Sequence, residues 1–301
     1  MRITEADVLR LLPMPEAVRL VREAFTGLAT GTAQNQARRR LVTPAGAVLH
    51  QLAGSFGKYF GAKIYSTHVK YGAWFTVLLY DAATARPLAE IEANHLGQIR
   101  TGAASGVATD LLARPDASVL GVIGTGFQAE TQIAAIRAVR QIREVRVWSR
   151  SEERRLAFAQ KVNARATASA EEAIRGADII VTATYAKDPV LEDAWVKPGA
   201  HINAIGSNNP QRREIPAELI NRAARIAVDA IDQAKIESGD LLLAWAAAPE
   251  RWDDLRLVEL AAIAAGQKSG RDSSEDLTIF KSNGLGVQDI AVAGFVFERY
   301  S

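Results

Sequence analysis

The chain has 301 residues, of which 48% are hydrophobic and 23% are charged, an ordinary composition for a soluble globular protein. Its net charge of +2 argues against a nucleic-acid partner, and its apolar runs fall short of the ~20 residues that a membrane helix needs. The absence of cysteine excludes disulfides, thiolate metal sites and a cysteine nucleophile. The four histidines do not have the spacing of metal ligands, so we expect no metal. The N-terminus does not have the pattern of a signal peptide, and together these features predict a cytoplasmic protein.

The first third of the sequence changes from helical spacing to short strands. Apolar residues recur at helical spacing over 4–30, and Pro13 and Pro15 predict that this stretch forms two helices. Between 46 and 93, four short stretches rich in β-branched and aromatic residues are separated by turn residues, which predicts an antiparallel meander. Helical spacing then returns over 95–113.

From residue 118 onward, short apolar strands alternate with amphipathic helices. We expect the strands within "SVLGVIG", "EVRVWS", "ADIIVTAT", "AHINAIG" and "ARIAVDA". Serine–x–x–glutamate pairs that begin at Ser149 and Ser169 have the form of capping boxes at helix starts. Farther along we expect a helix over 254–266, a strand at "LTIFKS" and an apolar helix over 286–300. The alternation is typical of a doubly wound parallel sheet.

The two ends of the chain do not share this alternation. The sequence therefore predicts an α/β protein in which a Rossmann-type doubly wound parallel sheet is inserted in a discontinuous α+β domain. We expect residues 1–115 and 280–301 to form the outer domain, and residues 116–279 to form the inserted one.

A glycine-rich turn follows the first strand of the α/β region. Its pattern, Gly124-x-Gly126-x-x-Ala129, matches the fingerprint of dinucleotide-binding turns. Gly124 permits the tight turn, Gly126 lets the backbone approach a pyrophosphate, and the small Ala129 lets the helix pack on the strand. Because the pattern follows a strand and opens a helix, it predicts a bound dinucleotide rather than a turn without a ligand. The remaining residues of the turn are included in this site: Thr125, Phe127 and Gln128.

The end of the next strand bears on which dinucleotide is bound. In the fingerprint an acidic side chain at this point accepts hydrogen bonds from the ribose hydroxyls. This chain instead has Ser149, Arg150 and Ser151, with Arg154 one turn later. Guanidinium and hydroxyl groups suit a 2′-phosphate, so the sequence favours NADP(H). NAD(H) is the alternative if Ser149 only caps the helix and the arginines are solvated.

Over nearly its full length the sequence resembles the ornithine cyclodeaminase/mu-crystallin family. The resemblance rests on "RTGAASGVATDLLARPDASVLGVIGTGFQAETQ", "VWSRS", "DIIVTAT", "WVKPGAHINAIGSNNPQRREI" and "TIFKSNGLGVQDIA". It implies a homodimer whose outer domains pair and bind substrate, with NAD(P)-dependent chemistry at the Cα of a small amino or imino acid. The matching segments imply further cofactor-binding residues: Thr101, Thr182, Ala183, Thr184 and Gly206.

The resemblance also implies which residues bind the substrate carboxylate. They are Arg100 in "QIRTGAAS", Lys63 in "FGAKIYS" and an arginine in "ARRRL", which we assign to Arg38 with Arg39 and Arg40 as alternatives. The chemistry is reasonable, because an arginine fork binds a carboxylate through two donors. A lysine can orient the substrate and donate a proton if its pKa is lowered.

One departure from the family distinguishes its branches. Members that cyclise ornithine resemble "GGD-x-PGKTEL" in the loop after the fourth strand, where the aspartate is a catalytic base. Here Asn208 stands at the aspartate position, and an amide is not a base at neutral pH. The cyclising step therefore lacks its base, and hydride transfer at an imine carbon remains. Asn208 either hydrogen-bonds the substrate nitrogen or only shapes a turn.

The segment "SNGLGVQD" at 282–289 matches a family loop expected near the nicotinamide, and its Asp289 either acts there or caps the last helix. Together these features predict an NAD(P)H-dependent oxidoreductase that reduces a small α-imino acid or oxidises the matching amino acid, with Lys63, Asn208 and Asp289 as its catalytic residues. The alternatives are an ornithine cyclodeaminase-type ammonia lyase that recycles NAD, and a non-catalytic protein that binds NADPH or another ligand.

Overall fold

The computed structural model describes residues 1–300, and the chain divides into two compact units. Unit 1 consists of Met1–Ala103 and the chain from Gly284 onward, and unit 2 consists of Ala104–Asn283. The predicted class, a Rossmann-type domain inserted in a discontinuous domain, is confirmed. The first boundary falls inside one continuous helix, α3 (Asn94–Leu112). The sequence pattern predicts this boundary after residue 115, because the apolar residues keep helical spacing through the whole of α3.

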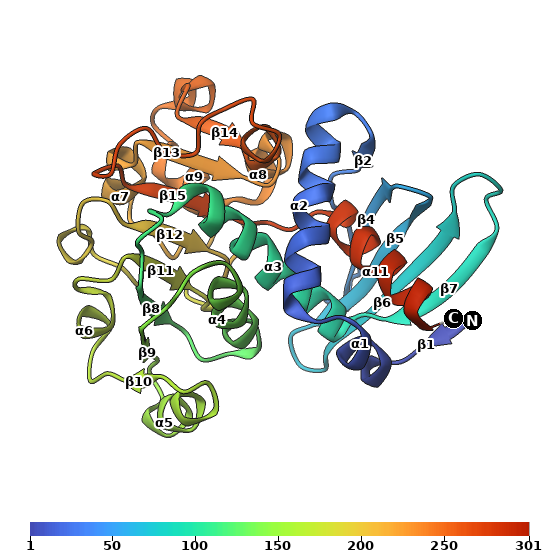
Figure 1. Ribbon diagram of the computed structural model, residues 1–301, viewed down its shortest axis with the longest axis horizontal. Helices are drawn as coiled ribbons and strands as arrows, with labels where there is room; N and C mark the ends of the chain where they lie inside the picture. The colour runs from blue at the N-terminus through green and yellow to red at the C-terminus, as the bar shows by residue number, and fades with distance from the viewer. Residues whose placement is uncertain (301) are drawn as a thin grey trace. The chain divides into compact units, whose positions relative to one another are not determined.

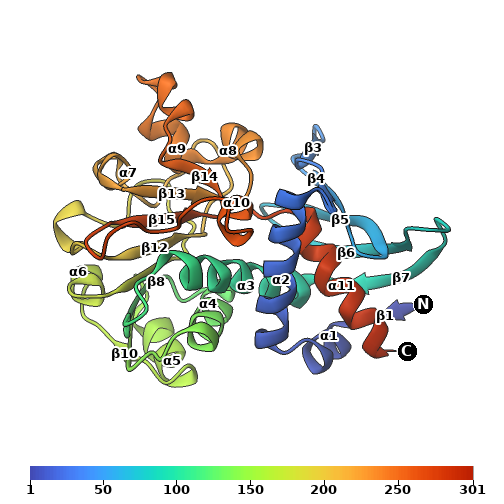
Figure 2. The same ribbon diagram turned by 45° about the horizontal axis from the view of Figure 1, so that its top comes forward.

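Unit 1 is built on a sheet with mostly antiparallel pairing (Figure 1). The strand order is β1-β7-β6-β5-β4-β2, with β3 paired to β4; β1 runs parallel to β7. The strands are β1 (Arg2–Ile3), β2 (Ala33–Asn35), β3 (Arg39–Val42), β4 (Val48–Phe56), β5 (Tyr59–His68), β6 (Gly72–Asp81) and β7 (Pro87–Glu92). The predicted meander corresponds to β4 to β7 and is confirmed. Figure 2 shows β3 beside β4 at one end of the sheet.

Helices cover one face of this sheet. They are α1 (Glu5–Leu11), α2 (Met14–Thr30) and α11 (Gly286–Tyr300), of which α2 and α11 lie side by side in Figures 1 and 2. The predicted division into two helices is confirmed: Pro13 is the N-cap of α2, and Pro15 lies in the first turn of α2. Helix α11 is buried along most of its length and contacts β4, β5 and β6. Gly54 of β4 permits this close packing, since a Cβ there would lie 2.6 Å from the backbone nitrogen of Val287.

Unit 2 contains a parallel sheet of eight strands in the order β10-β9-β8-β11-β12-β15-β13-β14. The strands are β8 (Val119–Ile123), β9 (Glu144–Trp148), β10 (Arg165–Ala166), β11 (Ile179–Thr182), β12 (His201–Ala204), β13 (Arg225–Val228), β14 (Leu257–Glu259) and β15 (Thr278–Lys281). From β8 the chain builds outward to β9 on one side and later to β11 on the other. The carboxyl end of β8 is therefore the point of strand reversal at which open α/β sheets bind ligands.

The helices of unit 2 connect these strands. They are α4 (Phe127–Val139), α5 (Glu152–Lys161), α6 (Ala170–Ile174), α7 (Ala217–Arg222), α8 (Ile231–Glu237), α9 (Gly239–Ala244) and α10 (Leu260–Ala264), with short 3₁₀ helices η1 (Asp193–Trp195) and η2 (Pro249–Asp253). No helix within residues 1–300 is long and apolar enough to cross a membrane.

Two local predictions in unit 2 are wrong. The segment 254–266 is not one helix, because Leu257 and Val258 are buried as an edge strand paired with β13 and only then does α10 begin. Ser149 does not cap α5, because the helix begins two residues later and the Ser151 hydroxyl accepts the bond from the Arg154 backbone nitrogen. Ser169 caps α6 as predicted.

Candidate active site

Three charged side chains singled out from the sequence meet inside unit 1. Lys63 on β5, Arg100 on α3 and Asp289 in the first turn of α11 are all buried. The Oδ1 atom of Asp289 accepts hydrogen bonds from Lys63 Nζ and from Arg100 Nε, each 2.9 Å long. The side-chain oxygen of Gln288 accepts a further bond from Arg100 Nη1 at 3.1 Å. Three segments far apart in the sequence thus build one charge cluster.

The local structure explains how these residues reach the cluster. Side chains alternate along β5, so Lys63 shares the inward face of the strand with the buried Gly61 and Tyr65. A carboxylate in the first turn of a helix is stabilised by the helix macrodipole, which suits Asp289. The sequence left open whether Asp289 caps the last helix, and the structure pairs it with two cations.

The environment makes Lys63 a group that can exchange a proton. Burial, the largest cause, and the nearby guanidinium of Arg100 lower the pKa of Lys63 to about 7, against the opposing effect of Asp289. Arg38 lowers this pKa as well. A lysine with such a pKa can act as a general acid or a general base near neutral pH.

Arg38 differs from the two arginines that follow it. Arg38 is only 8% exposed, and its Nη2 donates a hydrogen bond of 3.4 Å to the backbone oxygen of Gly284. Arg39 and Arg40 are exposed. Of the three alternatives that the sequence left open, Arg38 is the buried one, and it acts electrostatically on Lys63.

Gly284 holds the backbone close to the charge cluster. Its φ of +80° lies in the left-handed region that favours glycine. A Cβ at this position would lie 2.6 Å from Nη1 of Arg100. Only glycine therefore fits at position 284, because any side chain would collide with the guanidinium of Arg100.

An aromatic row that was not predicted from the sequence adjoins Lys63. The rings of His50 and Tyr65 stack with centroids 4.2 Å apart, and those of Tyr65 and Phe75 with centroids 4.9 Å apart. The Lys63 ammonium lies 5.7 Å from the centre of the Tyr65 ring. The period of two along β5 was the signal that could have revealed Tyr65, since it places residues 63 and 65 on one face.

The predicted dinucleotide turn in unit 2 has the backbone that such a turn needs. Gly124 has a φ of +108°, and a Cβ there would lie 2.3 Å from the backbone oxygen of Ala183. A Cβ on Gly126, the N-cap of α4, would point into open space, which is where a pyrophosphate would approach the helix N-terminus. Ala129 is fully buried and Phe127 is exposed. These features fit a dinucleotide phosphate.

The residues after β9 fit the region around the adenosine ribose. The Thr125 hydroxyl donates a bond of 3.0 Å to the Ser149 hydroxyl, which connects the glycine turn to the end of β9. Arg150, Ser151 and Arg154 are exposed. The end of β9 thus presents hydroxyl and guanidinium groups where the fingerprint has an acid.

The remaining cofactor candidates are distributed over both units. Thr101 lies in unit 1, where its hydroxyl donates to the backbone oxygen of Gly97 at 2.7 Å. Thr182, Thr184 and Gly206 of unit 2 gather around the buried carboxylate of Glu214, which was not predicted from the sequence. The other members of the predicted site in unit 2 are half-buried: Gln128 and Ala183.

Asn208 is exposed on the loop after β12. The turn around it is held by its neighbours, because the Ser207 hydroxyl accepts a bond from the Asn209 backbone nitrogen and the Asn209 side chain accepts one from Gln211. The amide of Asn208 therefore stands on a loop that other side chains shape. Asn283, at the end of unit 2, is buried, and its backbone nitrogen donates to Asp229.

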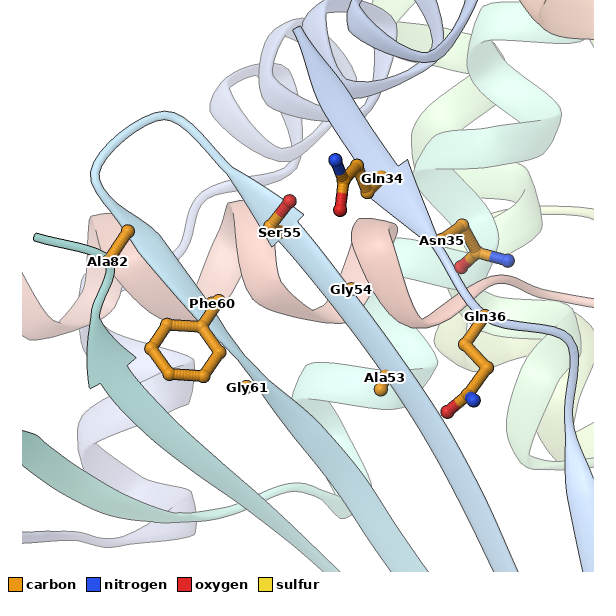
Figure 3. Close-up of a pocket in the computed structure, with 9 residues that line it drawn as sticks. All are labelled: Gln34, Asn35, Gln36, Ala53, Gly54, Ser55, Phe60, Gly61 and Ala82. Atoms are coloured by element: carbon orange, nitrogen blue, oxygen red, sulfur yellow. The ribbon is translucent and has the colours of Figure 1, made fainter. Parts of the chain in front are cut away.

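A separate cavity of about 470 Å³ lies in unit 1 beside the short strand β2. Figure 3 shows it lined by residues of β2, β4 and β5 and the turns beside them: Gln34, Asn35, Gln36, Ala53, Gly54, Ser55, Phe60, Gly61 and Ala82. None of the residues predicted for catalysis or carboxylate binding lines it. The cavity is therefore distinct from the charge cluster around Lys63.

Comparison with known proteins identifies the family. Residues 1–301 match the Ornithine cyclodeaminase/mu-crystallin family. A Delta(1)-pyrroline-2-carboxylate reductase of Bacillus cereus is 44% identical over 229 residues, covering 74% of this chain and 70% of the relative. The structure of Thermococcus litoralis Delta(1)-pyrroline-2-carboxylate reductase in complex with NADH and L-proline has a TM-score of 0.93 and 30% identity, covering 99% of this chain and 97% of that chain. An archaeal alanine dehydrogenase dimer with bound NAD has a TM-score of 0.93 and 35% identity, covering 99% and 95%. This chain therefore belongs to the ornithine cyclodeaminase/mu-crystallin family.

Proposed function

We propose that the protein is an NAD(P)H-dependent oxidoreductase that reduces a small α-imino acid, with the cyclic imine Δ1-pyrroline-2-carboxylate as its favoured substrate. The observation that carries the proposal is the buried cluster of Lys63, Arg100 and Asp289, in which a proton-exchanging lysine adjoins a guanidinium. The two similar reductases favour a cyclic imine over an open-chain one.

The charges of the cluster call for an anion. Arg38, Lys63 and Arg100 bring three cationic groups against the single carboxylate of Asp289. Cationic groups gathered in a buried site attract an anion, so this cluster favours a second carboxylate, here that of the substrate. The guanidinium groups of Arg38 and Arg100 would bind it through charge-assisted hydrogen bonds.

Lys63 would supply the proton. Reduction of an imine adds a hydride to the carbon and a proton to the nitrogen, and the dihydronicotinamide supplies the hydride when it is bound. The ammonium of Lys63 donates the proton to the substrate nitrogen, and Asp289 keeps the lysine oriented through the 2.9 Å bond. Oxidation of the amino acid runs these steps backward, with neutral Lys63 as the base.

Asn208 directs the chemistry away from cyclisation. Ring closure from a diamino acid requires a base that takes a proton from the side-chain ammonium, and an amide cannot do so near neutral pH. The amide oxygen of Asn208 can accept a hydrogen bond from the substrate nitrogen once Lys63 has protonated it. We therefore assign it to substrate orientation.

The test is cofactor oxidation by the purified protein. NADPH and NADH are each followed by absorbance with Δ1-pyrroline-2-carboxylate, with pyruvate and ammonia or methylamine, and with L-ornithine as the control for cyclodeamination. We expect rapid oxidation with the cyclic imine and formation of proline. Proline formed from ornithine without net cofactor change would reject the reductase assignment in favour of a cyclodeaminase. Cofactor binding without any turnover would instead favour a binding protein.

The pH dependence of reduction should report Lys63. A lysine is protonated below its pKa, so kcat/KM for imine reduction should be level below about 7 and fall as the pH rises above it. The bound carboxylate of the substrate favours the ammonium, so the corresponding fall in kcat should lie at higher pH. The measurement is steady-state kinetics from about pH 5 to about pH 10, a range that extends well to either side of this value. A profile without a descending limb would remove Lys63 as the proton donor.

We propose NADP(H) as the preferred cofactor. The support is the run of Ser149, Arg150 and Ser151 at the end of β9, with exposed Arg154 in the first turn of α5. A 2′-phosphate there would accept charge-assisted hydrogen bonds from the guanidinium groups.

The double replacement of Arg150 and Arg154 by alanine tests this preference. We expect KM for NADPH to rise about 10- to 100-fold, as the loss of a charged hydrogen bond implies, with KM for NADH nearly unchanged. Lys268→Ala, which removes an exposed cation elsewhere on the same unit, is the matched control. Equal KM values for the two cofactors in the unmodified protein would refute the preference.

We also propose a homodimer formed through unit 1. Strands β3, β5 and β6 expose large apolar side chains: Leu41, Val42, Phe60 and Trp74. The strand register puts Leu41, Phe60 and Trp74 on one face of the sheet, and exposed apolar side chains on one face often mark a protein–protein interface. The similar archaeal alanine dehydrogenase is a dimer. Light scattering after size exclusion should give twice the chain mass, and Trp74→Glu should shift it toward the monomer.

A further inference from the structure

A fully buried carboxylate at the carboxyl ends of β11 and β12 has no part in the chemistry described so far. Glu214 Oε1 accepts hydrogen bonds from the backbone nitrogen of Thr184 at 2.6 Å and from its hydroxyl at 2.7 Å. Its Oε2 accepts from the hydroxyl of Thr182 at 3.0 Å and from the backbone nitrogen of Gly206 at 2.8 Å. One side chain thus connects the ends of two neighbouring strands.

A second carboxylate, Asp240, binds the backbone beside Glu214 and is itself paired with a lysine. Asp240 Oδ1 accepts from the backbone nitrogens of Glu214 at 2.6 Å and Ile215 at 2.9 Å. Lys281 at the end of β15 forms an ion pair of 2.9 Å with Asp240 Oδ2, and its ammonium donates to the backbone oxygen of Ser207 at 2.5 Å. Lys281 and Asp240 are both fully buried, so this support is shielded from water.

The loop that carries Asn208 is anchored at both ends by these contacts. Gly206 and Ser207 are held just before Asn208, and Glu214 is held after it. Gly206 fits so tightly that a Cβ there would lie 2.4 Å from Glu214 Oε1 and 2.3 Å from the backbone oxygen of Thr184. The exposed part of the loop therefore leaves the sheet from a fixed base.

The bonding pattern requires a carboxylate at position 214. Four donors point at the two oxygens of Glu214, and two of them are backbone N–H groups, which cannot accept. Burial raises the pKa of Glu214, and the Lys281 ammonium opposes that shift. A buried anion is costly to maintain, and the four donors around Glu214 offset that cost. The residues it holds are those assigned to the dinucleotide.

We propose that Glu214, supported by the Lys281–Asp240 ion pair, is a positioning residue that sets Thr182, Thr184 and Gly206 for the dinucleotide. This inference rests on the proposed function. Glu214 is fully buried and acts through the groups that it binds. It should control cofactor affinity more than affinity for the imino acid, whose proposed carboxylate-binding residues, Arg38 and Arg100, belong to unit 1.

Glu214→Gln is the sharp test, because it keeps the shape and puts an amide N–H₂ against donors. We expect the Kd for NADPH, from fluorescence titration, to rise about 10-fold or more, as an unsatisfied buried polar group implies. KM for the imino acid at saturating NADPH should rise less than this Kd, because its carboxylate is bound by Arg38 and Arg100 of unit 1 and only Asn208 depends on the loop that Glu214 anchors. Circular dichroism establishes that the variant is folded. Should it fail to fold, Glu214→Asp keeps the charge but is too short to reach both Thr184 and Gly206, and the same rise in Kd is expected.

Asp178→Asn is the matched control at the opposite ends of the strands. Asp178 is also buried and accepts backbone hydrogen bonds, from Ser118 and Val119 at 2.9 Å each, and it pairs with Lys197. This variant should lower Tm as Glu214→Gln does, yet leave the Kd for NADPH within about twofold of the unmodified protein.

The outcomes separate the two proposals. If the unmodified protein binds NADPH and a folded Glu214→Gln variant binds it equally well, the positioning role is overturned and the proposed function stands. Equal weakening of binding in Glu214→Gln and Asp178→Asn also overturns it, because the effect is then one of general stability. If the unmodified protein binds neither NADPH nor NADH, both proposals fail together.

Discussion

Lys63→Met is expected to lower kcat for imine reduction by about 10²- to 10⁴-fold, the range for loss of a general acid. Methionine has a similar length but no proton to donate. The fold should persist, because the change removes a buried cation whose burial is itself unfavourable, and Asp289 keeps its bond of 2.9 Å to Arg100. Steady-state kinetics with the cyclic imine measure kcat, and the Kd for NADPH shows whether the variant still binds the cofactor.

Two further variants isolate the proton. Lys63→Arg keeps a cation beside Asp289 but cannot release a proton near neutral pH, so kcat should fall and the descending pH limb should disappear. Lys58→Met removes an exposed lysine from the turn between β4 and β5 and should leave kcat unchanged. If Lys63→Met retained more than about a tenth of the activity, Lys63 would be an orienting group and not the proton donor.

Asp289→Asn should weaken both the fold and the reaction. Asp289 is fully buried, and its Oδ1 serves both Lys63 and Arg100, so the replacement leaves two buried cations without a counter-charge. Removing one partner of such a group costs about 3–5 kcal/mol in the free energy of unfolding. Without the carboxylate, the pKa of Lys63 should fall further, because Asp289 is the group that raises it. At pH 7.5, about half a unit above the present value, kcat should therefore drop as well.

Urea denaturation and the pH profile measure these two effects separately. Glu298→Gln on the same helix is the control. Glu298 is half-exposed and pairs with Lys58 and Tyr59 at the other end of α11. Its replacement should lower the free energy of unfolding by less than about 1 kcal/mol. A stable Asp289→Asn variant with an unshifted pH profile would mean that the carboxylate does not control Lys63.

The sequence by itself determined the class of fold and the cofactor turn, because those features are local. Strand and helix periodicities are set by the spacing of apolar residues, and Pro13 at the start of α2 ends one helix wherever it occurs. The cofactor turn can likewise be recognised from Gly124 and Gly126 alone. A backbone that must turn tightly and approach a phosphate requires glycine at these positions. The family resemblance added Lys63 and Arg100 as candidates.

The local pattern failed where tertiary contacts outweigh propensity. Leu257 and Val258 have the spacing of a helix, yet they are buried as a strand because the edge of β13 is there to pair with them. Ser149 matches a capping box, but α5 begins where the Ser151 hydroxyl meets the Arg154 backbone nitrogen.

Only the tertiary structure decided which charged groups share an environment. Three consecutive arginines are equivalent in sequence, and folding buries Arg38 while it leaves Arg39 and Arg40 exposed. Asp289 is 226 residues from Lys63, and no local rule pairs them. Glu214 falls at the glutamate of the family loop "GGD-x-PGKTEL", but its role depends on donors from two other strand ends, which the loop sequence does not reveal. Electrostatic effects act through space, so the lowered pKa of Lys63 becomes visible only when the chain is folded.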